Sequence, residues 1–418
     1  MKQFYLCIDL KSFYASVECV ERNLDPFKVN LVVADSTRGH GAITLAATPA
    51  IKKLGVKSRG RIYEIPKNIH YITATPRMSL YMDYAVRIHK IYLQYISCDD
   101  IHVYSIDESF FDITSYLSLY QMSPKEIALM LMKAVYDETG ITATCGIGTN
   151  LYLAKVALDI TAKHSDDHIG FLDEESYCQS LWYHQPLTDF WMIGQGTLQR
   201  LKSMGITNMY EIAHAPEKQL VKMFGVNAHY LIAHAWGQES VKIADIKAYQ
   251  PKSSSISNSQ ILFEDYSCQD AYLVMKEMVE SNILRLTAQH LVTNHITLYI
   301  GYSKNIIRAS RGSHKIGITT NSYRLLLKEF KQLYQQIVNP DYPIRQIAIS
   351  FGNVKDEIYE QYDLFTDLEA IEKEKKLQLA IVEVKDKYGK NAILKGMNYL
   401  EKATARKRNT LIGGHNAK

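Results

Sequence analysis

The sequence contains no Cys-x-x-Cys pair, no Gly-x4-Gly-Lys-Ser/Thr motif and no apolar run that approaches the roughly 18 residues of a membrane-spanning helix. The six cysteines are scattered along the 418 residues, so we expect reduced thiols rather than a zinc site or a disulfide framework. The N-terminal residues lack the layout of a signal peptide. These absences argue against a P-loop motor, a membrane protein and an exported protein, and they predict a cytoplasmic location.

A large excess of positive charge is also missing, since the net charge is only +4, but the charges are unevenly distributed. Residues 241–355 contain 14 Lys and Arg against 8 Asp and Glu, whereas residues 356–369 contain six acids and no base. Residues 370–418 are basic again, with 12 Lys and Arg against 5 acids. A basic module suits a polyanionic partner such as nucleic acid, although a solvated surface gives the same pattern.

The first informative stretch is an apolar run over residues 4–9 that ends on Asp9. Its length is typical of a buried strand, and the helical spacing of Phe13, Val17 and Val20 predicts a helix directly after it. A carboxylate at the exit of a buried strand suits a metal ion, but it also suits a plain helix cap. This stretch alone leaves both interpretations open.

A second stretch, residues 101–114, consists of two β-rich runs that meet at Asp107 and Glu108. Adjacent side chains of a regular strand point to opposite faces, so these two acids serve one site only at the tip of a hairpin. Acids that repel one another beside an apolar core need compensating cations. Together with Asp9, the pair predicts two divalent ions held by oxygen ligands, as in an in-line phosphoryl displacement.

Residues 9–18 and 105–110 resemble the two catalytic motifs of the Y-family (lesion-bypass) DNA polymerases, most of all their bacterial UmuC-like branch. The similarity to the family pattern extends over nearly the whole chain. It implies an α+β multidomain fold, the right-hand polymerase with palm, fingers, helical thumb and an α+β little finger. The implied domains are the palm (1–22 and 78–165), the fingers (23–77), a helix-hairpin-helix thumb (166–240), a linker (241–252), the little finger (253–355) and a C-terminal tail (356–418).

The resemblance implies error-prone translesion synthesis, in which a primer 3′-hydroxyl on primer-template DNA attacks the α-phosphate of a dNTP. Asp9, Asp107 and Glu108 would be catalytic and would hold two Mg²⁺ ions, with the backbone carbonyl of Leu10 as an additional ligand. The implied nucleotide-binding residues are Phe13, Tyr14, Lys52 and Lys155. The implied DNA-binding residues are Gly194 and Gly196 in the hairpin and Arg308, Arg311 and Lys315 in the little finger.

Three nucleotide contacts have a more specific role in this interpretation. Tyr14 would lie under the sugar as a steric gate against ribonucleotides, and Asp159, one turn after Lys155, would orient that lysine. Lys52 would reach the triphosphate from a helix predicted over residues 45–54. The family often has Tyr and Arg at the positions aligned with Pro49 and Lys52, so this chain lacks a hydroxyl and a bidentate guanidinium there.

Residues 361–365, Gln-Tyr-Asp-Leu-Phe, resemble the bacterial sliding-clamp-binding peptide. Gln361 would fix the register while Leu364 and Phe365 fill an apolar pocket, and we expect the peptide to be extended and unfolded when free. The alternative is a strand or linker that packs Leu364 and Phe365 on the little finger.

Two rival functions remain at this point, a palm-type nucleotidyl cyclase and a catalytically idle DNA-binding scaffold. A cyclase leaves the hairpin, the linker and the basic C-terminal module without a purpose. The intact acids Asp9, Asp107 and Glu108 argue against an idle scaffold. The need for an accessory subunit stays open.

Overall fold

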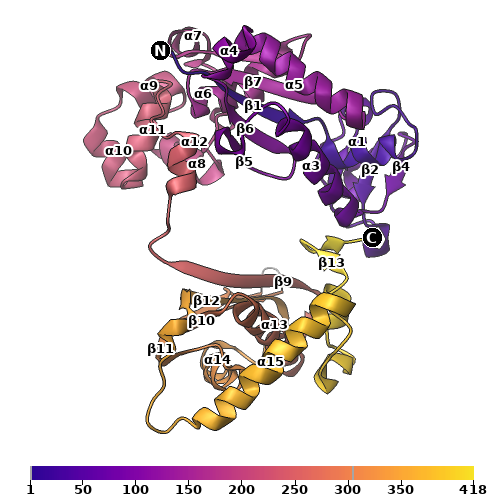
Figure 1. Cartoon of the computed structure of the whole chain (residues 1–418), viewed down its shortest axis with the longest axis vertical. Coiled ribbons are helices and arrows are strands. Elements are labelled where there is room, and N and C mark those ends of the chain that lie inside the picture. The colour runs from indigo at the N-terminus through magenta and orange to yellow at the C-terminus, as the bar shows by residue number, and fades with distance from the viewer. Residues whose placement is uncertain (1, 304–305) are drawn as a thin grey trace. The chain divides into compact units, whose positions relative to one another are not determined.

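The computed structural model describes residues 2–303 and 306–418, which form two compact units (Figure 1). The first unit comprises residues 1–249 together with 415–418, and the second comprises residues 250–414. No helix in the described ranges combines the length and the apolar character that a membrane span requires.

A five-stranded sheet with the order β5-β6-β1-β7-β8 forms the centre of the first unit. Its middle strand is antiparallel to both neighbours, and only the β7–β8 pair is parallel. The strands are β1 (Tyr5–Leu10), β5 (Ile101–Val103), β6 (Glu108–Asp112), β7 (Ala143–Gly148) and β8 (Ile169–Leu172). Nearly every residue of β1 is buried, as the apolar run predicts.

Side chains of this sheet alternate between two faces. Cys7 packs on one face with Ala154 of helix α6 (Leu151–Val156). On the other face the ring of Phe111 lies 4.8 Å from that of Tyr92 in helix α3. The helices that flank the sheet are α3 (Met78–Tyr92), α4 (Tyr116–Tyr120) and α5 (Pro124–Thr139). Because Asp9 follows Cys7 by two residues, its side chain belongs to the α6 face.

A small second sheet, ordered β3-β2-β4, lies beside helix α1. It consists of β2 (Leu31–Ala34), β3 (Thr44–Ala47) and β4 (Ile72–Ala74), and the helices next to it are α1 (Phe13–Val20) and α2 (Pro49–Lys53). The helix predicted over residues 45–54 is therefore wrong in its first half. Leucine and alanine favour helices, but pairing with β2 overrides that preference, and Pro49 occupies the first helical turn.

Residues 174–248 form short helices joined by turns. The helices are α7 (Glu174–Leu181), α8 (Gln195–Ser203), α9 (Met209–His214), α10 (Glu217–Phe224), α11 (Asn227–Ala235) and α12 (Ile243–Ala248). The last of them lies within the predicted linker 241–252, which is a correction. Ile243 is buried with Tyr5 and Phe110 of the central sheet, and Ile246 packs against the same cluster, so two apolar side chains anchor this segment.

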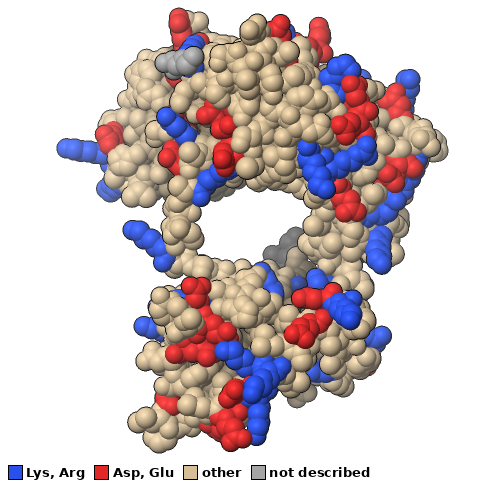
Figure 2. Space-filling model, in the orientation of Figure 1, with Lys and Arg blue, Asp and Glu red and all other residues tan. Residues whose placement is uncertain are grey.

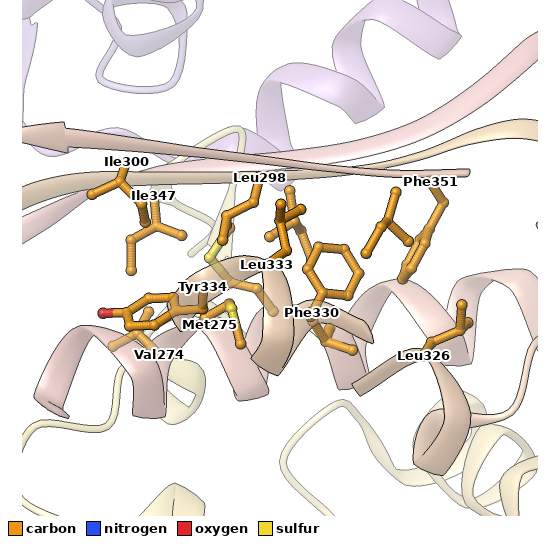
Figure 3. Packing of buried hydrophobic residues seen from close by; sticks show 14 of the residues in the cluster. Val274, Met275, Leu298, Ile300, Leu326, Phe330, Leu333, Tyr334, Ile347 and Phe351 are labelled. Atoms are coloured by element: carbon orange, nitrogen blue, oxygen red, sulfur yellow. The ribbon is translucent and has the colours of Figure 1, made fainter. Parts of the chain in front are cut away.

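The second unit is an antiparallel sheet ordered β11-β10-β12-β9, with two long helices on one face. Its elements are β9 (Ser254–Tyr266), α13 (Cys268–Ala288), β10 (Leu291–Tyr302), β11 (Ser310–Thr320), α14 (Tyr323–Ile337) and β12 (Ile344–Asp356). Figure 3 shows the core between the layers, where Leu298 and Phe351 of the strands meet Met275 and Phe330 of the helices. Strand β9 begins at Ser254, two residues after the end of the predicted linker.

The predicted C-terminal tail is folded. Helix α15 (Leu368–Tyr388) packs on α13, with Ile371 and Gln378 buried. The Gln378 side chain accepts a hydrogen bond from Thr287 at 2.9 Å. The remaining elements are α16 (Ala405–Arg408), β13 (Leu411–Ile412) and β14 (His415–Asn416).

Candidate active site

The three predicted acids lie at one end of the central sheet. Asp9 on β1 is directly opposite Glu108, the first residue of β6. Asp107 precedes that strand, and its carbonyl accepts a hydrogen bond from the backbone N–H of Leu10 at 2.9 Å. The short connection between β5 and β6 is the hairpin tip that the two neighbouring acids need if both are to serve one site. This connection brings the two neighbouring acids to the end of β1.

The charges of these acids act on one another. Burial, followed by the charges of Asp107 and Glu108, raises the pKa of Asp9 to about 7. The Asp107 carboxylate accepts a hydrogen bond from the Ser105 hydroxyl at 2.6 Å. Like charges held this close resist ionisation unless a cation compensates them.

Glu108 already has partners in this arrangement. Its Oε1 accepts hydrogen bonds from the Cys7 thiol at 3.0 Å and from Lys155 Nζ at 2.8 Å. Within the described ranges, no three Asp, Glu, His or Cys side chains converge closely enough to form a metal-binding group as they stand. An all-oxygen donor set with excess negative charge nevertheless fits a hard divalent cation.

Lys155 is placed by the close packing of α6 on β7. A Cβ atom on Gly146 would lie 2.0 Å from the carbonyl oxygen of Ala154, and one on Gly148 would lie 2.2 Å from the amide nitrogen of that residue. Only glycine permits this approach. The Lys155 side chain is 10 % exposed and also pairs with Asp159 at 3.0 Å, in the π-helical turn Ala157–Thr161.

The electrostatic environment of Lys155 keeps it protonated. Desolvation lowers the pKa of Lys155, but Cys7, Asp159 and Glu108 outweigh it and raise the pKa above its usual value. The predicted pairing with Asp159 is therefore present. The pairing with Glu108 was not predicted, because the two residues are far apart in sequence and meet only through the glycine contact.

Tyr14, in the first turn of α1, is held against a second tyrosine. Its ring stacks on that of Tyr81 with 4.5 Å between the centroids and 16° between the planes. Burial and the charge of Asp107 raise the pKa of Tyr14, which places it near the acids. Phe13 is only 2 % exposed. The Phe13 side chain therefore lies in the core, whereas that of Tyr14 is half-buried, and the nucleotide contact of Phe13 stays a prediction.

A buried carboxylate supports this tyrosine pair. Glu18 is fully buried and accepts hydrogen bonds from the Tyr81 hydroxyl at 2.7 Å and from Arg77 at 2.8 Å and 3.0 Å. Arg22 forms a further ion pair with it. Sequence reasoning missed Tyr81 and Arg77. The signal available was Glu18 itself, an acid among apolar residues that has to find cationic partners.

Lys52 extends from α2 toward the start of α1. Its Nζ donates a hydrogen bond to the Ser12 hydroxyl at 2.7 Å. Burial lowers the pKa of Lys52, whereas the charge of Asp9 raises it and the charge of Lys163 lowers it. The proximity to Asp9 brings this cation to the carboxylate end of the sheet even though α2 is shorter than predicted. Lys11 lies nearby, since Lys52 and Lys53 add to burial in lowering its pKa.

The predicted hairpin residues Gly194 and Gly196 lie at the start of α8. Gly194 is the N-cap residue, and neither glycine has another atom within 4 Å of the position of a Cβ. The first backbone N–H groups of a helix have no intrahelical acceptor. This open helix start suits a phosphate group.

Arg311 and Lys315 lie on β11 and share the sheet face opposite the helices. A Cβ atom on Gly312 would meet Leu333 of α14, so Gly312 is on the helix face. Because side chains alternate along a strand, Arg311 and Lys315 are on the other face. In the register of β10 and β11, Arg311 is opposite Tyr299 and Lys315 is opposite His295. Arg308 is exposed in the connection before β11. Figure 2 shows acidic and basic side chains interspersed on the visible face of the second unit, so the charge excess is not a continuous basic face there.

The predicted clamp-binding residues differ sharply in their surroundings. Leu364 is 99 % exposed and Phe365 is 96 % exposed, which rules out the alternative that they pack on the little finger. Gln361, in contrast, is bonded through its backbone to Thr319 at the end of β11. The expectation that the whole peptide is unfolded when free is therefore wrong for its first residue.

The carboxylate-bearing hairpin, the buried lysine and the sheet-and-helix second unit define a polymerase. The model of the impB/mucB/samB family matches residues 8–159, and that of the family's C-terminal domain matches residues 253–364. A putative UV-damage repair protein, UvrX of Bacillus subtilis, is 32 % identical over 98 % of this chain and 97 % of its own length. DNA polymerase IV 2 of Halalkalibacterium halodurans is 27 % identical over 99 % of this chain and 100 % of its own length.

A solved Y-family DNA polymerase chimera of Dbh and Dpo4 has the same fold, with a TM-score of 0.65 and 19 % identity over 84 % of this chain and 99 % of the chimera. The chain belongs to the impB/mucB/samB family of Y-family DNA polymerases. It is a DNA-directed DNA polymerase of translesion synthesis and acts in DNA damage tolerance on primer-template DNA and dNTPs. The predicted fold class is confirmed. Y-family DNA polymerases generally use divalent metal ions.

Proposed function

We propose that this polymerase is error-prone and that Asp9, Asp107 and Glu108 hold two Mg²⁺ ions, with the Leu10 carbonyl as an additional ligand. The observation that carries the proposal is the position of Asp9 directly opposite Glu108, with Asp107 beside them at the end of β1. Burial, and then the charges of Asp107 and Glu108, raise the pKa of Asp9, as expected where a cation is needed. Two bound ions would neutralise charge at the reacting phosphate and make the primer 3′-hydroxyl more acidic.

The residues of the chain would then act as follows. Lys155 exchanges its contact with Glu108 for the triphosphate and stays oriented by Asp159. This exchange releases Glu108 to join Asp9 and Asp107. Lys52 binds the same triphosphate from the side of α2. Support for both lysine roles comes from their contacts near the acids: Lys155 Nζ lies 2.8 Å from Glu108, and Lys52, bonded to Ser12 at 2.7 Å, is close enough to Asp9 for that charge to raise its pKa against the effect of burial.

Tyr14 would act as the steric gate against ribonucleotides. A gate must be fixed, because a mobile ring could yield to a 2′-hydroxyl. The stacking on Tyr81 and the contact of Tyr81 with Glu18 supply that support. The short helix α2, five residues long, offers few side chains to test the shape of a new base pair, which supports low fidelity.

DNA would be held without regard to sequence. The open start of α8 at Gly194 and Gly196 suits one phosphate, and Arg308, Arg311 and Lys315 suit the backbone along β11. The residues that surround them on the same sheet face are small or polar, such as Thr297, Ser313 and Ser350. Such a face lets a duplex approach closely.

The exposed Leu364 and Phe365 would dock on the bacterial sliding clamp and tether the polymerase to DNA. A tether raises the local concentration of the enzyme at a primer end without altering its active site. The cytoplasmic location expected from the sequence belongs to the same proposal.

The decisive experiment is primer extension by the purified protein with dNTPs and Mg²⁺. Extension of a primer past a template lesion, with frequent misinsertion on intact template, is the expected result. Cyclic nucleotide formation from an NTP would instead support a cyclase. DNA binding without any nucleotide addition would support an idle scaffold.

A further inference from the structure

The peptide that carries Leu364 and Phe365 is attached to the second unit on its N-terminal side. The backbone N–H of Gln361 donates to the Thr319 carbonyl at 2.9 Å, and the N–H of Thr319 donates to the Gln361 carbonyl at 2.8 Å. The Tyr362 hydroxyl lies 3.2 Å from the Thr320 hydroxyl. The peptide therefore begins as a one-residue extension of the sheet beside β11.

A lysine of the following helix holds the residues just before this bridge. Lys375 of α15 pairs with Glu357 at 2.8 Å and with Glu360 at 3.6 Å. Glu357 also accepts a hydrogen bond from the Asn321 side chain at 3.0 Å. Without Lys375, two neighbouring acids in a stretch that contains no base would repel each other. The lysine thus converts an acidic segment into an ordered one.

The apolar tip itself is shaped by a turn. The Asp363 carboxylate accepts hydrogen bonds from the Phe365 N–H at 3.0 Å and from the Thr366 hydroxyl at 2.7 Å. Four residues after Asp363, Asp367 caps α15 by accepting a hydrogen bond from the Ala370 N–H at 3.0 Å. Leu364 and Phe365 therefore project from a short loop with both ends fixed.

We propose that residues 361–365 are presented to the clamp in a pre-formed conformation and that Lys375 is the positioning residue that maintains it. This inference rests on the proposed clamp contact. The partner needs an apolar pocket for Leu364 and Phe365 and a rim rich in cations, because residues 356–369 contain six acids and no base. We infer that the partner is a sliding clamp whose pocket has such a rim.

The physical advantage is a smaller ordering cost. A free peptide loses conformational entropy when it binds, whereas a peptide already held in its bound shape loses less. Two ion pairs at a partly exposed lysine give a modest effect. We expect Lys375→Ala to weaken binding to the purified bacterial sliding clamp about three- to tenfold.

Lys376→Ala is the matched control, since Lys376 is on the same helix, is mostly exposed and forms its ion pair within that helix, with Glu372. Equal clamp affinity of the wild type and Lys375→Ala would overturn the inference. The double variant Leu364→Ala/Phe365→Ala separates the two proposals. If it binds the clamp as well as the wild type does, the tether assignment itself fails.

Hydrogen exchange of the full chain gives a readout that does not depend on the partner. The amide of Gln361 should be protected in the wild type and in Lys376→Ala, and it should exchange faster in Lys375→Ala. A Gln361 amide that exchanges in the wild type at the rate of a free peptide would overturn the pre-formed presentation.

Discussion

The two large sheets of this polymerase differ in where their charged side chains lie. The five-stranded sheet has Asp9, Asp107 and Glu108 at one end of its middle strands, where they are half-buried and where Glu108 pairs with Lys155 of the adjoining helix α6. The four-stranded sheet has Arg311 and Lys315 on its edge strand β11, exposed to solvent on the face opposite the helices. Charged side chains at strand ends gather around one point, as a catalytic site requires. Charged side chains on an open sheet face are spread out, as binding along a nucleic-acid backbone requires. Substitutions in the two places should therefore differ in size and in kind.

The largest effect is expected from Asp107→Ala. Loss of a carboxylate from the charged strand end should lower nucleotide addition by at least about a thousandfold, because metal-assisted stabilisation of the transition state is worth several kcal/mol. DNA binding should change little. Single-turnover primer extension and a separate DNA-binding titration measure both. Asp99→Ala, an exposed acid of the same region, is the control. More than a few per cent of residual activity in Asp107→Ala would refute the role of this acid.

A second large effect, on stability, is expected from Glu18→Gln. The change leaves Arg77 and Arg22 without their buried partner and should cost about 2–4 kcal/mol of unfolding free energy. Although burial raises the pKa of Glu18, hydrogen bonds from Arg77, Tyr81 and Arg22 outweigh it and lower the pKa. The stabilisation is therefore complete above the unfolded-state pKa, about 4.3, and is lost as the pH falls through the lower folded-state pKa. Denaturant unfolding of both proteins at neutral pH and near pH 3 tests this. A difference that grows in acid would contradict it.

An intermediate effect is expected at the tyrosine pair. Tyr14→Ala should reduce the preference for dNTP over rNTP about 10- to 200-fold, the range found when a pocket loses one packing element. Tyr81→Ala should reduce it less, and Tyr81→Phe, which keeps the stacked ring, should retain most of it. Insertion kinetics with matched nucleotides give the ratio. Unchanged discrimination in Tyr14→Ala would exclude the gate.

The smallest effect is expected on the open face of the second sheet. Arg311→Ala and Lys315→Ala should each lower the slope of log affinity against log salt by about one, because each would release one phosphate contact. Lys331→Ala on α14, the helix layer on the other face, should leave the slope as it is. Equal slopes for all three variants would mean that DNA does not bind along β11.

The sequence predicted that the three acids come together, but it did not predict most of the contacts that surround them. Asp9, Asp107 and Glu108 could be found because an acid at a strand end or a hairpin tip leaves a local pattern. The Lys155–Glu108 and Tyr14–Tyr81 contacts could not, because each joins segments that are distant in the chain. Helix α12 is only six residues long and lies between polar residues, so the sequence predicts a linker there, and Leu and Ala in the strand at 44–47 predict a helix instead. The pairing of Gln361 with Thr319 is a backbone interaction that side-chain patterns do not encode.

The glycine contact between β7 and α6 also limits what variation can do. Any side chain at position 146 or 148 would collide with helix backbone rather than with a movable group. We therefore expect a mutant library to tolerate only glycine at both positions, and the helix that carries Lys155 to keep its place on β7. A search for variants that accept altered nucleotides should leave β7 untouched and randomise α2, the helix beside the small second sheet that carries Lys52.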